Sequence, residues 1–254
     1  MAIETRKFSK KQIKTIAHRG LSAFETENTL AAFIAAGNKS YYGIETDVHV
    51  TKDGKFVIIH DDNLLRSAGI DMSVEESLYA NLKKVALYDV NAGVLDGDGT
   101  VLTKNKRTDL LIPDLDEYLN ICKKYDKQAI LEIKNPMTEK NIKDIIDICE
   151  KCDYFKGVTF ISFAIDNLVI LKKLRPDADV QFLSCNRDDF AKKLPTVLEY
   201  KMDVDLGYWL LTKDDVDFLH SKNIKINVWT PSKIEDAEKF DDWGVEFITS
   251  NILE

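Results

Sequence analysis

The chain has 254 residues, of which 44% are apolar and 31% are charged, a composition typical of a globular protein with enough apolar side chains for a core. Its formal net charge of −8 argues against a nucleic-acid partner and against electrostatic attachment to an anionic membrane surface. No stretch approaches the ~20 apolar residues of a membrane span, and residues 1–14 lack the apolar segment of a signal peptide, so we expect a cytoplasmic protein without stable membrane association.

Short apolar runs alternate with helical patterns along the chain. The candidate strands are residues 14–18, 43–48, 129–133, 158–162, 180–184, 203–207, 225–229 and 246–249. Strands that alternate with helices are typical of repeated βα units with a parallel sheet. Eight such units in about 250 residues favour a closed (β/α)8 barrel, the TIM barrel, over an open doubly wound sheet. We therefore expect an α/β protein in which residues 1–254 form one domain.

Polar residues mark the starts of the first two predicted helices. Asn28 is expected to cap the helix after the first strand, and Asp114 the helix that runs to about Tyr125. Glu27 has two interpretations, because it can cap the same first helix or brace Arg19.

An additional apolar run, residues 56–59, follows the second strand across the Asp-Gly pair at 53–54. Asp-Gly between two strand patterns predicts a hairpin with a two-residue turn. That turn would place Asp47 opposite His60, with Glu45 on the same face. The turn chemistry thus predicts a histidine beside two carboxylates.

Residues 61–113 are too many for an ordinary βα loop and are expected to form an insertion in the barrel. The insertion carries one helical pattern, from about Val74 to Val85, and a polar tract at 91–109. Because it leaves the strand end that bears His60, we expect it to cap the mouth of the active site.

Several charged residues lie in or at the ends of segments that otherwise resemble buried strands: His18, Arg19, Glu45, Asp47, His60, Glu132 and Lys134. A buried carboxylate without a partner costs several kcal/mol, so these side chains are expected to converge. The three carboxylates suit a hard divalent cation such as Mg²⁺ or Ca²⁺. The two histidines suit a general base and a general acid, and the two cationic side chains suit phosphate oxygens.

The motifs around these residues resemble the glycerophosphodiester phosphodiesterase family in order and spacing. They are His18-Arg19-Gly20, Glu27-Asn28-Thr29, Glu45-Thr46-Asp47-Val48, Asp53-Gly54, His60-Asp61 and Leu131-Glu132-Ile133-Lys134. Later landmarks, such as Asn227-Val228-Trp229-Thr230, extend the resemblance from about residue 15 to the C-terminus.

The resemblance implies metal-dependent hydrolysis of glycerophosphodiesters to glycerol 3-phosphate and an alcohol. The catalytic pair of the family matches His18 and His60. The metal ligands match Glu45, Asp47 and Glu132, and the phosphate contacts match Arg19 and Lys134. The glycerol 2-hydroxyl of the substrate is then expected to attack phosphorus, and water to open the cyclic product. The resemblance also implies that the insertion caps the barrel.

Two features leave the choice of substrate open. Trp229 and Phe163 end strands at the expected mouth, where either can pack on a glycerol or a headgroup, or belong to the core; Trp229 is the better candidate for substrate contact. Arg66-Ser67-Ala68-Gly69 follows the family's capping motif only loosely. The alternative is a related, phospholipase D-like barrel enzyme that acts on lysophospholipids, although the polar tract at 91–109 favours soluble diesters. A sugar-phosphate binder without catalysis is disfavoured, and the oligomeric state is left open, with a homodimer as one option.

Overall fold

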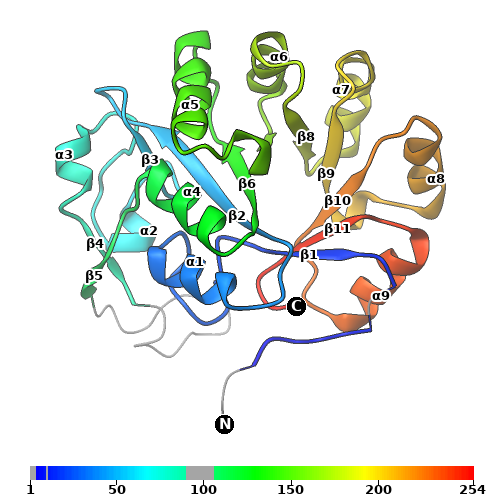
Figure 1. Cartoon of the computed structure of the whole chain (residues 1–254), viewed down its shortest axis with the longest axis horizontal. Coiled ribbons are helices and arrows are strands. Elements are labelled where there is room, and N and C mark those ends of the chain that lie inside the picture. The colour runs from blue at the N-terminus through cyan, green and yellow to red at the C-terminus, as the bar shows by residue number, and fades with distance from the viewer. Residues whose placement is uncertain (1–3, 10, 90–105) are drawn as a thin grey trace.

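The computed structural model describes residues 4–9, 11–89 and 106–254 (Figure 1). Within them, eight parallel strands close into a barrel through the pairing of β1 with β2, in the order β1-β11-β10-β9-β8-β7-β6-β2. The strands are β1 Lys14–Ala17, β2 Gly43–Val50, β6 Gln128–Ile133, β7 Val158–Ser162, β8 Asp179–Ser184, β9 Asp203–Gly207, β10 Ile226–Trp229 and β11 Phe247–Ser250. The predicted TIM barrel is confirmed.

Helices connect the strands and surround the barrel (Figure 1). The long ones are α1 Leu30–Gly37, α4 Leu115–Lys124, α5 Glu139–Lys151, α6 Ile165–Leu174, α7 Arg187–Glu199, α8 Lys213–Ser221 and α9 Ile234–Trp243, and the short 3₁₀ turns are η2 Phe155–Gly157 and η3 Tyr208–Leu210. In α5, for example, Ile142, Ile145 and Cys149 are spaced along one face and are fully buried, so the main core lies between helices and strands.

The capping predictions were right for α4 and wrong for α1. Asp114 is the N-cap of α4, and its N–H donates to the Glu117 carboxylate at 2.8 Å. The N-cap of α1 is Thr29, whose hydroxyl accepts from the N–H of Ala32. Asn28 instead points to the barrel interior, where its amide donates to Asp47 Oδ2 at 2.8 Å.

The hairpin exists, but its register differs by one residue from the prediction. β3 (Phe56–Ile58) pairs antiparallel with β2, with His49 opposite Val57. The turn consists of residues 52–54, because the N–H of Thr51 already donates to the carbonyl of Lys55 at 2.7 Å. Asp47 therefore faces Ile59, and His60 follows beyond the last contact of the pair.

The segment between β3 and α4 contains α2 Leu65–Ala68, α3 Tyr79–Leu82, β4 Ala86–Tyr88 and β5 Lys106–Leu111, gathered at one side of the barrel (Figure 1). The predicted helix over 74–85 is wrong, since only α3 is helical there. The apolar residues that produced the helical pattern are buried in a different way. Val74, Leu82 and Val85 pack in a second hydrophobic cluster that also includes Val57 of β3. Residues 91–105 of the polar tract lie outside the described residues. No helix in the described parts is long and apolar enough to cross a membrane.

Candidate functional site

Six of the eight predicted site residues line a pocket of about 150 Å³ at the carboxyl ends of the barrel strands, where TIM-barrel active sites lie, and the other two, Asp47 and Lys134, lie against Glu132 beside it. Its lining residues are His18, Arg19, Glu45, His60, Glu132, Ile161, Phe163, Leu183, Asp205, Trp229 and Thr249. Parallel pairing sets Asp47 of β2 level with Glu132 of β6. His18 directly follows β1, and His60 follows β3, so four chain segments place the charged side chains.

Three carboxylates form a compact cluster beside this pocket. One oxygen each of Glu45, Asp47 and Glu132 lies within 4.8 Å of the others, and all three residues are buried. Asp47 Oδ1 has no hydrogen-bond partner among the described residues, although Lys134 Nζ lies 3.4 Å away. Oxygen ligands lie roughly 2.0–2.6 Å from Mg²⁺ or Ca²⁺, so one such ion can contact all three residues. The cluster fits a divalent cation.

Mutual repulsion and burial set the protonation of this cluster. Burial and the charge of Asp47 raise the pKa of Glu45 well above its ordinary value and that of Glu132 to about 7. Burial would also raise the pKa of Asp47, but Lys134 and Arg19 hold it below the ordinary value. A bound cation would therefore compete with protons for Glu45 and Glu132.

The two predicted phosphate ligands lie against the carboxylates. Arg19 adopts a left-handed backbone (φ 54°), and its N–H donates to Glu45 Oε2 at 2.7 Å. Its guanidinium donates to Glu27 at 3.0 Å and lies 3.6 Å from Asp47, so Glu27 braces Arg19. Lys134 Nζ lies 2.9 Å from Glu132 Oε1. Ion pairs therefore hold the side chains of both Arg19 and Lys134 close to the pocket.

Both histidines are oriented through Nδ1. His18 Nδ1 is 2.7 Å from Asn251 Oδ1, and His60 Nδ1 is 2.8 Å from Asp61 Oδ1. Each ring thus has its Nε2 atom left for proton transfer, and both residues line the pocket. Burial and the adjacent Arg19 charge lower the pKa of His18 to about 4, so its ring is neutral at neutral pH.

A network that sequence reasoning did not assign supports His60. Arg66 of α2 donates to Asp61 at 2.6 Å and to Glu27 at 2.6 Å. It thereby links the carboxylate that orients His60 to the carboxylate that orients Arg19. Burial tends to raise the pKa of Asp61, but hydrogen bonds from His60 and Arg66 keep it below its ordinary value. The His60-Asp61 motif carried this signal in the sequence.

The opposite wall of the pocket is mainly apolar and aromatic. Trp229 lies edge-to-face with Phe163 and Trp209, at ring distances of 5.8 and 5.5 Å. Its indole N–H donates to the main-chain carbonyl of Asp205 at 3.3 Å. Trp229 is only partly buried, so one part of the ring packs on the barrel while another faces the pocket. Asp205 itself was not predicted as a site residue.

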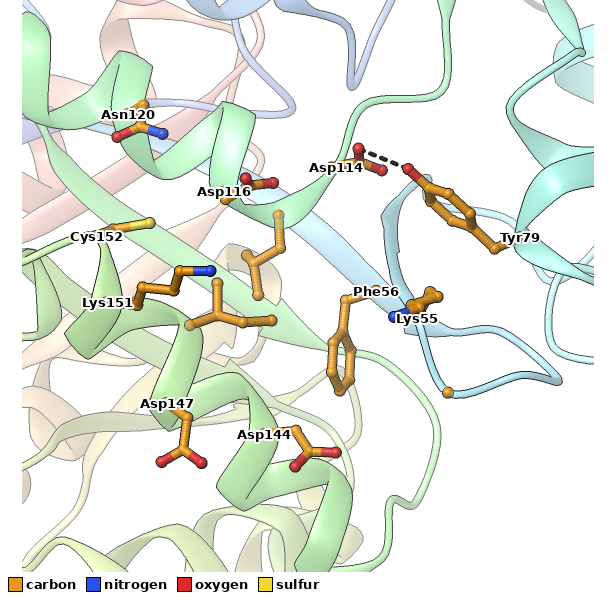
Figure 2. Close-up of a pocket in the computed structure, with 13 residues that line it drawn as sticks. Lys55, Phe56, Tyr79, Asp114, Asp116, Asn120, Asp144, Asp147, Lys151 and Cys152 are labelled. Carbon is orange, nitrogen blue, oxygen red and sulfur yellow. Dashed lines mark hydrogen bonds between the residues drawn. The ribbon is translucent and has the colours of Figure 1, made fainter.

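A larger hollow, of about 680 Å³, lies elsewhere, between the hairpin turn, Tyr79, α4 and α5 (Figure 2). Figure 2 shows Asp144 and Asp147 of α5 on one side and Tyr79 on the other, with the Tyr79 hydroxyl donating to Asp114 at 2.8 Å. None of the predicted site residues lines it. Size alone therefore does not identify the functional pocket in this molecule.

Comparison with known proteins agrees with the geometry. A curated Bacillus subtilis glycerophosphodiester phosphodiesterase is 26% identical over 253 residues, covering 94% of this chain and 84% of that protein. A human lysophospholipase D is 22% identical over 259 residues, covering 91% of this chain and 80% of that protein.

A solved structure shares the fold: an Oleispira antarctica phosphodiesterase in complex with the product sn-glycerol-3-phosphate, with a TM-score of 0.80, 22% identity, and coverage of 95% of this chain and 94% of that chain. The model of the glycerophosphoryl diester phosphodiesterase family matches residues 18–253. The match extends over nearly the whole barrel and includes every residue of the charged cluster. The chain therefore belongs to the glycerophosphoryl diester phosphodiesterase family.

Proposed function

We propose that the protein hydrolyses glycerophosphodiesters to glycerol 3-phosphate and an alcohol with the help of a divalent cation. The observation that carries this proposal is the convergence of three buried carboxylates and two Nδ1-anchored histidines on one small pocket. A pocket of about 150 Å³ has the space of about five water molecules, which suits a small polar group such as glycerophosphate. Family membership supports the same activity.

The proposed cation ligands are Glu45, Asp47 and Glu132. Bound Mg²⁺ or Ca²⁺ would supply positive charge to the phosphate oxygens and favour the more negative transition state. Arg19 and Lys134 now neutralise the carboxylates at 2.9–3.6 Å. Once a cation satisfies the carboxylates, these two side chains are available to the phosphate, the guanidinium as a planar fork and the ammonium as a point charge.

The two histidines are proposed to carry the protons. His18, kept neutral by its lowered pKa, takes the proton of the attacking glycerol 2-hydroxyl at Nε2. His60 gives a proton from Nε2 to the oxygen of the departing alcohol as the phosphorus–oxygen bond breaks. In the second step a water molecule opens the cyclic phosphate, and the two residues exchange roles. Asp61 fixes the ring of His60 during both steps.

The segment 61–113 is proposed to be a capping insertion within a single domain of residues 1–254. Its α2 helix supplies Arg66, which contacts both Glu27 and Asp61. Its apolar residues form a cluster with Val57 and Ile59 that is separate from the main core. The cap thus has its own packing and a direct polar connection to the catalytic residues.

A second candidate function, phospholipase D-like action on lysophospholipids, is favoured by one observation. Phe163 and Trp209, which are 42% and 56% exposed, continue the aromatic wall of the pocket toward solvent. Such an exposed apolar edge can accept an acyl chain. The small volume of the pocket favours the soluble diester as the main substrate. The cytoplasmic location and the homodimer remain predictions.

A substrate panel tests the proposal. Alcohol release is measured from glycerophosphocholine, glycerophosphoethanolamine, glycerophosphoglycerol and lysophosphatidylcholine, each with saturating Mg²⁺ or Ca²⁺. We expect turnover of the soluble diesters to exceed that of the lysophospholipid. Preference for the lysophospholipid would establish the second candidate, and absence of turnover on every substrate would contradict both.

A further inference from the structure

The pocket wall opposite the charged cluster contains one carboxyl group, that of Asp205. Asp205 lies on β9, level with Leu183 of β8 and Asn227 of β10, and is 1% exposed. The other residues of this wall are Ile161, Phe163, Leu183, Trp229 and the hydroxyl-bearing Thr249. A carboxyl in such surroundings is costly to bury unless it has a polar partner.

The neighbouring Asn227 amide favours the charged form of the Asp205 carboxyl, but it does not supply a hydrogen bond to the Oδ1 atom. Asp205 Oδ1 is buried and has no hydrogen-bond partner among the described residues. The amide nitrogen of Asn227 donates instead to Thr249 at 3.0 Å and to Gln181 at 3.4 Å. The Trp229 indole donates to the main-chain carbonyl of Asp205 and not to its carboxyl group. Unpaired buried polar groups are rare in native proteins, and one that lines a cavity points to a ligand.

The position of Asp205 identifies the kind of ligand. Among the described residues, the group that can share one metal ion consists of Glu45, Asp47 and Glu132, without Asp205. With the phosphate drawn to the charged side, the neighbouring part of the ligand meets carbon side chains and this one carboxyl. Burial and the charge of Glu132 raise the pKa of Asp205, and both its neutral and its charged form accept hydrogen bonds. A three-carbon polyol offers carbon atoms to the wall and hydroxyls to the carboxyl.

We propose that Asp205 is a specificity residue that hydrogen-bonds a hydroxyl of the glycerol moiety, while Leu183 and Trp229 contact its carbon atoms. This inference rests on the proposed function, since it names the part of the substrate that occupies the apolar side. A site built to bind a hydroxyl discriminates strongly against an analogue that lacks it. The protein should therefore distinguish glycerol phosphates from alkyl phosphates of the same length.

Calorimetric titration of the Mg²⁺-loaded protein tests the inference. Glycerol 3-phosphate and propyl phosphate, which differ only in the two hydroxyls, are titrated into wild type, Asp205→Leu and Asp205→Asn. We expect Asp205→Leu to weaken glycerol 3-phosphate binding at least about tenfold and to leave propyl phosphate binding within about twofold. Asp205→Asn, which keeps an oxygen acceptor, should lose only part of the affinity for glycerol 3-phosphate. If Asp205→Leu does not fold, the comparison of Asp205→Asn with wild type provides the test.

The control is Asp203→Asn, which changes a carboxyl on the same strand that accepts from the N–H of Lys225 and does not line the pocket. It should leave both affinities unchanged. Equal weakening of both ligands by Asp205→Leu would indicate a structural role, and a weaker Mg²⁺ titration would indicate a cation ligand; either result overturns the inference. If wild type itself does not bind glycerol 3-phosphate, the proposed function fails first.

Discussion

The two sides of the pocket differ in charge. Each side has a buried carboxyl oxygen without a hydrogen-bond partner among the described residues, Asp47 Oδ1 and Asp205 Oδ1, but Asp47 lies beside the cationic Arg19 and Lys134. On the charged side, the Arg19 guanidinium and the rings of His18 and His60 each have a hydrogen-bond partner that fixes their orientation. On the opposite side, apolar and aromatic residues surround Asp205, whose Oδ1 atom has no partner among the described residues. The difference indicates a division of labour. We propose that the charged side acts on the phosphate that all diesters share and that the other side contacts what is attached to it, so changes on the two sides should affect different kinetic constants.

The largest effect is expected from removal of the cation. Exhaustive EDTA treatment should abolish turnover, and added Mg²⁺ or Ca²⁺ should restore it, because without a cation Arg19 and Lys134 stay paired with the carboxylates and the negative transition state loses its main positive charge. Glu45→Gln, Asp47→Asn and Glu132→Gln should each weaken cation binding in a calorimetric titration. Glu45→Gln and Glu132→Gln should leave thermal unfolding without metal close to that of wild type or move it upward, since burial disfavours the charge of both carboxyls. Asp47→Asn should lower the unfolding temperature, because Asp47 is paired with Lys134 and Arg19.

The next largest effect is expected from the histidines. His18→Ala and His60→Ala should each lower kcat by at least ~10²-fold, about 3 kcal/mol in the barrier, with a smaller change in KM. The double variant should lose far less than the product of the two, since both groups serve one displacement. His220→Ala, which removes a ring paired with Glu246 at 3.3 Å and remote from the pocket, is the control. An equal loss in the control would refute the assignment.

A smaller effect is expected from the support of His60. Asp61→Asn removes the charge that holds Nδ1 and should lower kcat about tenfold with little change in KM. The matched control is Asp62→Asn, the adjacent residue, whose carboxylate accepts from Asn135 at 2.9 Å. Steady-state kinetics of the two variants separates orientation of the ring from a general loss of negative charge. Identical kinetics for both variants would exclude a role for Asp61.

Cation affinity should depend on pH. Because the pKa of Glu132 is raised to about 7, protons compete with the cation, and Mg²⁺ affinity should fall about tenfold between pH 8 and pH 6. The stability of the metal-free fold should change with pH in the opposite direction. A raised carboxyl pKa stabilises the metal-free fold at low pH, and that contribution is lost as pH rises from about 4.5 through 7. In Glu132→Gln the pH dependence of Mg²⁺ affinity should be weaker, and an unchanged slope would contradict the explanation.

The smallest effect is expected on the apolar side. Trp229→Leu keeps an apolar side chain but removes the ring, so KM should rise about three- to tenfold while kcat changes little. Phe218→Leu, an exposed aromatic residue on α8 that does not line the pocket, is the control. A fall in kcat as large as that of His60→Ala would show that the two sides are not separable.

The sequence predicted the barrel and the charged side because both depend on local patterns. A carboxylate such as Glu45 or Glu132 is unusual within an apolar strand and can be recognised from the sequence alone. Parallel strands then bring their carboxyl ends to one edge of the barrel. The hairpin register was wrong by one residue because Asp-Gly occurs in more than one type of turn. Here the Thr51 hydroxyl accepts from the Lys55 N–H and donates to Asp53, which favours the longer turn.

Residues that depend on tertiary contacts could not be predicted in the same way. Asn28 resembles a helix cap, but a neighbouring threonine takes that place and the Asn28 amide reaches Asp47. Arg66 contacts Glu27 and Asp61 only because α2 folds back on the barrel. Asp205 sits in an ordinary strand pattern, and the missing partner of its Oδ1 atom becomes visible only when its neighbours are placed.

The most direct test of the central claim is glycerol 3-phosphate release from glycerophosphocholine by one preparation of wild-type protein, measured with metal, after chelation and after metal is restored. We predict release, loss and recovery, with choline as the second product. Undiminished release after exhaustive chelation, or glycerol and phosphocholine as the products, would contradict the proposed site.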